Sequence, residues 1–236
     1  MSHLITSSDD NLVRLTQFPI GYPVGSPVAG SWQVPILNPI ETTSLPTQFV
    51  AFDDRNRTLN PRSAAIHFYR DDWKFSSVIE RPLEWVSRFS DFGFILTPDI
   101  SIGDDMPPWM RQKKTCISRA IGVIWQSRGL QVIPSLRWRS NEDLPFVMAG
   151  ISEGGVIAVS NYGFRRDLSE RIIFRSGIEE ITNVLKPKVL LLYGSADANL
   201  KALLETKTQL IEFKSPIDSQ RQYLSKSPRD RHETLF

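Results

Sequence analysis

Six short apolar runs, each ending in polar or chain-breaking residues, recur along the chain with helix-length segments between them. Runs of this length that are rich in β-branched and aromatic residues are typical of the buried strands of a parallel sheet. A shorter strand is predicted at residues 49–52. The pattern therefore predicts an α/β fold built from repeated βα units, with its main strands in residues 64–72, 92–101, 130–139, 156–165, 189–197 and 209–216.

The segments between these runs predict helices. Residues 107–129 give the clearest one, because this segment begins with proline, ends with glycine and carries an apolar stripe. The helix at 168–187 is most secure over 178–185, and Pro145 weakens the helix at 140–151. Shorter helices are expected at 82–89 and 198–207.

Two architectures accommodate these units: an incomplete TIM-like barrel and an open, mostly parallel sheet. The barrel is slightly favoured, because polar residues end almost every strand, whereas a doubly wound sheet concentrates them at one switch point. Residues 1–48 are rich in proline and glycine yet carry apolar side chains, which predicts an extended arm packed over the domain. Residues 49–216 form the predicted α/β domain, and 217–236 a polar tail that we expect to be mobile.

Composition narrows the class of protein without naming a function. The 236 residues, 41% hydrophobic and 23% charged, fit one large soluble domain. The net charge of +2 is too small to indicate nucleic-acid binding by itself. One cysteine, Cys116, rules out an internal disulfide. Because no signal peptide or long apolar span is recognisable, we expect a cytoplasmic protein without a membrane partner; the sequence indicates no oligomeric state.

Carboxylates follow the first two main strands, and ligand sites of such folds lie beyond the carboxyl ends of the strands. Asp71 and Asp72 follow the first strand, and Asp99 and Ser101 follow the second. Such carboxylates can bind Mg²⁺ or divide acid and base roles between them. The alternative is that each caps the next turn or helix. Asp99, after a Thr-Pro pair, is the preferred catalytic candidate.

The other strand ends supply candidates for substrate binding. Arg137 can hold a phosphate or carboxylate, and Trp138 can stack on a base or sugar; alternatively Trp138 fills the rim of the core and Arg137 pairs with a carboxylate. Ser160 ends the fourth strand without the G-x-S-x-G pattern of an exposed serine nucleophile, and is retained as a weaker catalytic candidate. Tyr193 and Gly194 end the fifth, where the glycine suits either a ligand approach or an ordinary turn.

Several kinds of chemistry lack their motifs. The sequence has no Walker loop, no G-x-G-x-x-G and no histidine or cysteine cluster with metal spacing, so the usual nucleotide cofactors are not predicted. Mg²⁺ held by aspartates is the cofactor left open. His67, the only histidine outside the terminal segments, lies inside a strand, where a packed or hydrogen-bonded role is the better interpretation.

A basic stretch gives the sequence a second functional interpretation. Residues 106–141 contain arginines and lysines and no acidic residue. On a helix that advances about 100° per residue, Arg111 and Arg119 lie opposite the apolar stripe. Together with Lys114, they can meet the phosphates of a nucleic acid. The alternative is an ordinary solvated helix face.

Several motifs occur in an order that resembles an uncharacterised family, domain of unknown function four-four-one-seven (DUF4417). The likeness covers roughly residues 49–216. It implies a protein found near phage or plasmid genes and no established reaction, so no catalytic role is transferred. The family's P-D-F-S pattern stands here as Pro98, Asp99, Ile100 and Ser101. The motifs are HFYRDDWKF (67–75), LTPDISIGDDMP (96–107), GVIWQSRGLQVIPSLRW (122–138), GGVIAVSNYG (154–163), FRSGIEEI (174–181) and LLLYG (190–194).

The leading hypothesis is an enzyme-like α/β domain that acts on a nucleotide, a nucleic acid or another phosphorylated substrate. Hydrolysis would be acid–base or metal-assisted, with Asp99 as base or ligand and Arg137 as anion clamp. The alternative is a non-catalytic phage or plasmid protein that binds nucleic acid or a host protein through the basic helix and tail. A third is a scaffold that assembles through its N-terminal arm. The sequence does not decide whether the protein is an enzyme.

Overall fold

Two four-stranded parallel sheets form the centre of the computed structural model, which describes residues 21–40, 43–103, 105–164 and 167–215. Every strand predicted from the apolar runs is present, so the α/β class and the mostly parallel sheet are confirmed. No pairing between described residues closes the strands into a barrel. The first sheet contains β3 (Gln48–Ala51), β4 (Ala64–His67), β5 (Phe94–Leu96) and β6 (Val132–Ile133), and the second β7 (Ser135–Leu136), β8 (Val156–Ser160), β9 (Val189–Tyr193) and β10 (Gln209–Phe213).

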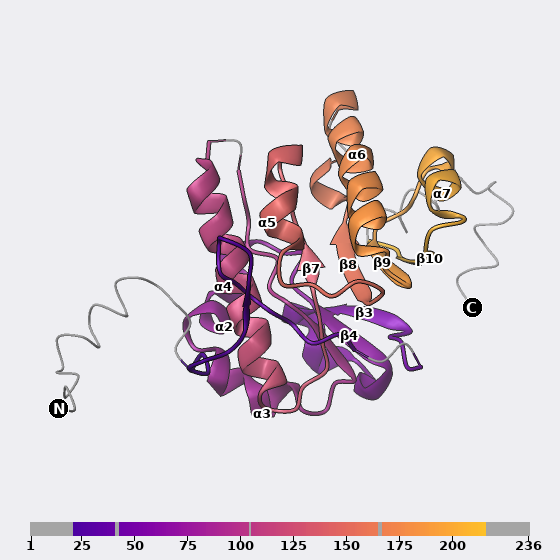
Figure 1. Cartoon of the computed structure of the whole chain (residues 1–236). Coiled ribbons are helices and arrows are strands. Elements are labelled where there is room, and N and C mark those ends of the chain that lie inside the picture. The colour runs from indigo at the N-terminus through magenta and orange to yellow at the C-terminus, as the bar shows by residue number, and fades with distance from the viewer. Residues whose placement is uncertain (1–20, 41–42, 104, 165–166, 216–236) are drawn as a thin grey trace, which may run out of the picture.

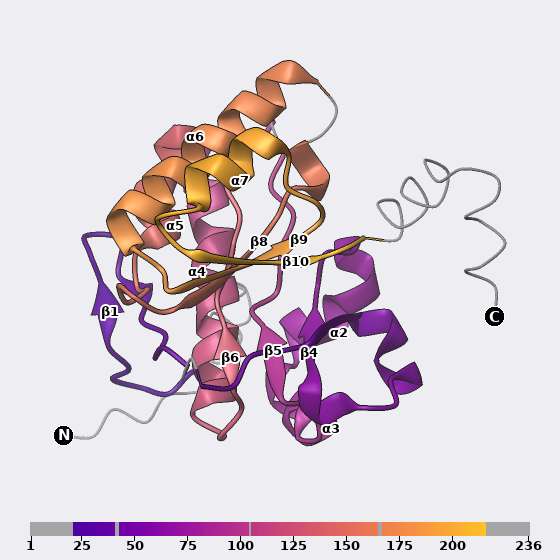
Figure 2. The ribbon, with the colours of Figure 1, turned by 90° about the vertical axis from the view of Figure 1, so that its right-hand side faces the viewer.

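Pro134 divides the third predicted strand into β6 and β7. Proline has no N–H to donate to a ladder, so the pairing changes at this residue. Before it, Val132 is in register with Ile95 of β5; after it, Ser135 is in register with Ala158 of β8. One chain segment thus borders both sheets, and the strands follow one another in sequence order (Figure 2).

Alternate side chains of the strands enter different cores. On β8 and β9, Ile157 and Leu190 belong to an outer core, whereas Ala158 and Leu191 belong to an inner core. The inner core also receives Phe94 from the first sheet, so side chains of both sheets share it. Both faces of these strands are therefore buried, which explains why their sequences read as continuous apolar runs.

Helices cover the outer faces of the sheets (Figure 1). The apolar side of α4 joins the outer core of the first sheet, whereas α5, α6 and α7 enclose that of the second. The predicted helices are present, and the one at 168–187 is regular almost throughout; α2 is too short to give a periodic signal. None of the helices in the described ranges has the length and apolar character to cross a membrane. Their bounds are α2 Ser76–Glu80, α3 Val86–Phe89, α4 Pro108–Gln126, α5 Leu144–Met148, α6 Leu168–Leu185 and α7 Ala198–Leu204.

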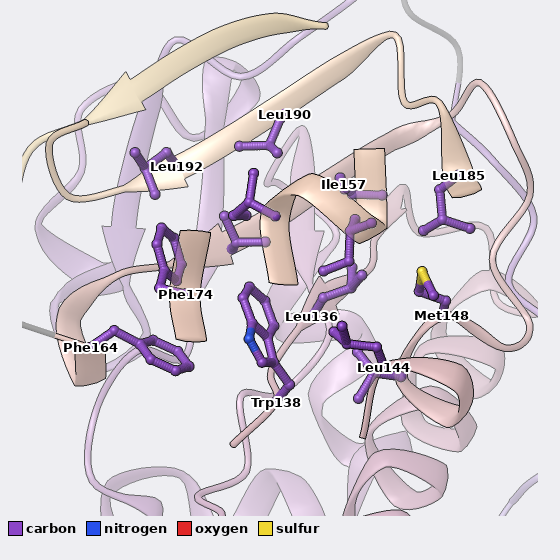
Figure 3. Close-up of a cluster of buried hydrophobic side chains, with 14 of the residues drawn as sticks. Leu136, Trp138, Leu144, Met148, Ile157, Phe164, Phe174, Leu185, Leu190 and Leu192 are labelled. Carbon is purple, nitrogen blue, oxygen red and sulfur yellow. The ribbon is translucent and has the colours of Figure 1, made fainter. Parts of the chain in front are cut away.

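Trp138 fills the centre of the second sheet's outer core (Figure 3). Its side chain is 1% exposed and stacks on Phe174, with ring centroids 5.5 Å apart, while Phe164 lies at 5.3 Å. Gly177 of α6 admits the indole, since a Cβ at that position would lie 2.4 Å from its Nε1. The predicted stacking of Trp138 on a ligand therefore does not hold in this structure, because the ring is enclosed by protein.

The described part of the N-terminal arm packs on α4 and on the loop after α5. β1 (Val28–Ala29) and β2 (Val34–Pro35) form a small antiparallel pair. The Leu37 N–H donates to the Gly150 carbonyl at 2.9 Å, and the Gln126 side chain bonds both backbone groups of Asn38. The domain division at residue 48 stays a prediction. The predicted tail, 217–236, lies outside the described residues.

Candidate functional site

Asp99 and Arg137 form an ion pair beyond the carboxyl ends of two neighbouring strands. Asp99 follows β5, Arg137 directly follows β7, and the Arg137 Nη1 to Asp99 Oδ2 distance is 2.5 Å. Asp99 is 5% exposed, whereas the Arg137 side chain is 35% exposed. The structure thus brings together the two residues given the leading roles, and it leaves the Arg137 side chain partly exposed.

The electrostatic surroundings of this pair perturb both groups. Burial raises the pKa of Asp99, Arg137 opposes that rise, and the charge of Asp72 adds to it. The Asp99 charge in turn raises the pKa of Arg137 more than burial lowers it. The pair thus combines a permanently charged guanidinium with a carboxyl whose pKa is raised, which is a combination suited to proton transfer.

Asp72 supports the loop that carries the site. Its carboxylate accepts the Ser101 N–H at 3.0 and 3.2 Å, and the Lys114 Nζ donates to the Ser101 carbonyl at 2.7 Å. Asp71 is exposed in the adjacent turn, where its carbonyl accepts the Lys74 N–H. Ser101 and Asp72 therefore position the loop after Asp99, and Asp71 belongs to the turn before α2.

Neutral polar and aromatic side chains lie beside the ion pair, toward the protein interior. The Tyr69 hydroxyl bonds Ser135 Oγ at 3.1 Å, and the Ser135 N–H donates to Thr97 Oγ1 at 2.9 Å. Tyr193, predicted to bind substrate, is buried and stacks on Tyr69 and against His67. Burial raises the pKa of Tyr69 well above its usual range and lowers that of His67 to about 3, so both are neutral at pH 7.

The ends of β8 and β9 are occupied by turns. Ser160 Oγ accepts the Tyr162 N–H at 3.1 Å, which is the capping role that short polar residues often take. Gly194 has a φ of 124°, a conformation that favours glycine, and its N–H donates to the Phe213 carbonyl. Asn161 Nδ2 donates to the Ser195 carbonyl at 2.8 Å. Ser160 and Gly194 thus serve the local backbone.

A cavity of about 20 Å³ opens between the ion pair and α4. This volume admits one water-sized group. Its charged lining comprises Lys114 and Arg119 of α4 together with Asp99 and Arg137. The cavity therefore has more positive than negative charge around it, which favours an anion.

The prediction of an exposed basic face on α4 is wrong for two of its three residues, Arg111 and Arg119. Arg111 is 8% and Arg119 1% exposed. Arg111 Nε donates to Asp143 at 2.9 Å, and Arg119 donates to backbone carbonyls beyond the helix. Helical-wheel reasoning assumes one buried face, whereas α4 is also covered by the arm and α5. An exposed phosphate-binding face over these arginines is therefore not formed.

Sequence reasoning missed the inward part of the site. Arg119, Ser118 and Ser135 line the cavity, although none was predicted there. The only signal was position: Ser118 and Arg119 stand within an otherwise apolar stretch of α4, and Ser135 lies inside a buried strand. A buried polar residue needs a partner, so such positions are informative once burial is known.

The aspartates fit a magnesium site poorly. Within the part of the chain that the structure describes, no group of three or more His, Cys, Asp or Glu side chains is placed to hold a metal ion. Asp72 is engaged by the Ser101 N–H and Asp99 by Arg137. We therefore assign the site no metal-dependent step.

Comparison with known proteins shows that the chain is similar in sequence to phage proteins. The family model described as "Domain of unknown function (DUF4417)" matches residues 26–214. The "Gene 1 protein" of Mycobacterium phage D29 is 33% identical over 188 residues, covering 77% of this chain and 69% of the relative. The protein of the same description from Mycobacterium phage L5 is 31% identical over 168 residues, covering 70% and 72%. No solved structure matches the chain.

Proposed function

The chain belongs to the DUF4417 family, and from that premise we propose a phage-associated protein whose α/β domain binds and hydrolyses a phosphorylated substrate of the nucleotide or nucleic-acid class. The phage relatives support the biological setting. The Asp99–Arg137 pair supports the chemistry, because it joins an anion-binding group to a proton-transfer group where α/β folds place their ligands.

Each member of the pair has a separate role in the proposed reaction. Arg137 Nη1 is directed to Asp99, and the remaining guanidinium donors are available to phosphoryl oxygens. Asp99 accepts a proton from a water molecule as the water oxygen bonds to phosphorus. The bond between phosphorus and the leaving oxygen breaks, and Asp99 returns the proton to that oxygen. Because burial raises its pKa, Asp99 is a stronger base than an exposed aspartate.

Exposed aromatic rings favour a substrate that contains a base. Trp73, Trp109 and Tyr162 are 73%, 62% and 55% exposed. They lie after β4, at the start of α4 and after β8, which are all segments at the carboxyl side of strands. Bases stack readily on such rings, with a contribution of about 1–3 kcal/mol per base.

Hydrolysis assays on the full chain test this proposal. A phosphomonoester, a set of nucleotides and single-stranded DNA and RNA would be assayed with and without Mg²⁺. We expect Asp99→Asn to lower kcat by roughly 10²–10⁴-fold, the usual contribution of general acid–base catalysis. Asp91→Asn, which changes an exposed carboxylate before β5, is the matched control and should keep full activity. Absence of hydrolysis on every substrate, or full activity of Asp99→Asn, would contradict the proposal.

The second candidate function is binding of single-stranded nucleic acid without catalysis. The exposed aromatic residues support it, since base stacking needs no catalytic group. In that case Trp73→Ala and Tyr162→Ala should weaken binding of single-stranded nucleic acid, while Asp99→Asn leaves it unchanged. Leu59→Ala, which removes a fully exposed apolar side chain, is the control. Nucleic-acid binding unaffected by loss of either aromatic ring would count against this role.

A further inference from the structure

Arg119 carries a buried charge without a carboxylate partner in the described part of the chain. Its side chain is 1% exposed, Nη1 donates to the Ser135 carbonyl at 3.1 Å, and Nη2 donates to the Val147 carbonyl at 2.9 Å. Nε is buried and has no hydrogen-bond partner among the described residues. Burial lowers the pKa of Arg119 to about 10, which leaves it charged at neutral pH. Burying a charge is unfavourable unless the charge is paired, so a bound anion would stabilise this guanidinium.

The cavity beside Arg119 has the charge to hold that anion. Lys114, Arg119 and Arg137 contribute three positive charges to its lining, and Asp99 contributes one negative charge, which leaves an excess of two. Asp72 acts on Arg137 from outside the lining and reduces this excess without reversing it. The surroundings of the cavity therefore stay net positive, which favours a phosphoryl anion.

The dimensions of the cavity limit how such a group enters. A volume of about 20 Å³ admits one water-sized group, which is the size of one phosphoryl oxygen. The remaining oxygens would lie at the opening, where the Arg137 side chain is 35% exposed. A terminal phosphoryl group has three non-bridging oxygens and can engage all three cationic side chains of the lining, whereas a phosphodiester has only two such oxygens.

We propose that the cavity between α4 and the Asp99–Arg137 pair binds a terminal phosphoryl group, with one oxygen held by Arg119 and the others by Arg137 and Lys114. This assignment deepens the proposed function and rests on it for the reaction, because it narrows the substrate class to phosphomonoesters. Arg119 and Lys114 are binding residues in this assignment, and Asp99 stays the proton-transfer group.

Inorganic phosphate is the probe for this site. The full chain would be titrated with sodium phosphate by calorimetry, and its Tm would be measured against sodium chloride at equal ionic strength. We expect saturable binding of one phosphate and a Tm rise of about 3 °C when phosphate exceeds its Kd tenfold. Stabilisation by phosphate no greater than that by chloride would overturn the proposal.

Substitutions on one helix separate the site from the general surface. Arg119→Lys and Lys114→Met should each weaken phosphate binding at least about tenfold, because each loses a charge-assisted hydrogen bond. Lys113→Met removes an exposed charge from the adjacent position and should bind as the wild type does. If Arg119→Lys fails to fold, Lys114→Met decides alone, since Lys114 is only half-buried at the edge of the cavity. Wild-type affinity in the folded variants would overturn the assignment.

The two proposals fail in different ways. Phosphate binding that depends on Arg119 and Lys114, without hydrolysis of any substrate, would retain the phosphoryl site and remove the catalytic function. Hydrolysis that depends on Asp99, with unchanged inhibition by phosphate in Lys114→Met and Arg119→Lys, would retain the function and remove this site.

Discussion

Phe49 of β3 and Phe213 of β10 stack face to face, with ring centroids 3.9 Å apart and planes inclined by 4°. These strands are the outer strands of different sheets, and no backbone pairing between described residues joins them. On one side the sheets meet through the chain segment at Pro134. On the other side, the edge strands β3 and β10 contact each other through these two rings. In a closed barrel, backbone hydrogen bonds would join these strands.

Removing this stack should destabilise the fold. We expect Phe213→Ala to lower the free energy of unfolding by about 3 kcal/mol, because it leaves a cavity beside the inner core. A double-mutant cycle with Phe49→Ala should give a coupling energy of about 1 kcal/mol from urea unfolding. Additive effects of the two substitutions would show that the rings do not stabilise each other.

Acid should destabilise the protein in part through His67. Its pKa is lowered to about 3 by burial, whereas an unfolded histidine titrates near 6.5, so the unfolded state binds a proton more readily. The stability contributed by neutral His67 is present above pH 6.5 and is lost as the pH falls toward 3. The loss at pH 4 is about 3 kcal/mol.

His67→Asn is the variant that isolates this effect. The asparagine oxygen can replace Nδ1 as acceptor of the Tyr69 N–H, and it does not titrate. Unfolding in urea at pH 7 and pH 4 should show a smaller loss of stability in the variant than in the wild type. Equal losses would mean that other groups account for the acid sensitivity.

Loss of Arg137 should make stability more dependent on pH. Burial raises the pKa of Asp99 and Arg137 opposes the rise, so Arg137→Met should raise this pKa further. A carboxyl with a raised pKa stabilises the fold when protonated, and that contribution is lost as the pH rises through the folded-state pKa. We expect the variant to lose about 2 kcal/mol at pH 7 and less at pH 4, the figure allowing for the partial exposure of Arg137. Adding Asp99→Asn should remove the difference between the two pH values.

Gly177→Ala tests the packing of Trp138 against α6. Alanine normally stabilises a helix by about 1 kcal/mol relative to glycine, but here its Cβ would lie 2.4 Å from the indole Nε1. We expect the clash to dominate and to lower stability by about 1–3 kcal/mol, measured by urea unfolding. Glu180→Ala on the exposed side of the same helix should change stability little. A stabilised Gly177→Ala variant would show that the indole can move.

The strands were predictable because both of their faces are buried, which makes each strand a continuous apolar run. Residues 130–139 were predicted as one strand, whereas the pairing changes at Pro134, which has no N–H to donate. The contact between Phe49 and Phe213 was not predictable, since it joins residues 164 positions apart whose own segments carry no sign of each other. Closure is a property of the accumulated twist of the sheets, which local patterns do not encode.

The central pair of the site was predictable from its position beyond the carboxyl ends of the strands. Asp99 follows β5 and Arg137 follows β7, and the structure pairs them. Trp138 follows Arg137 immediately, yet the alternation of a strand turns its side chain to the opposite face, into the outer core. The prediction that Arg119 is exposed was wrong for a different reason. The N-terminal arm and α5 also cover α4, so the helix is buried on more than one side.

The break at Pro134 gives the Asp99–Arg137 pair a mechanical position. Asp99 extends from the first sheet and Arg137 from the second, so their bond crosses the seam between the two halves of the domain. A ligand that contacts both side chains would therefore connect the first sheet to the second. We expect such a ligand to slow amide hydrogen exchange in β6 and β7, the strands on either side of Pro134.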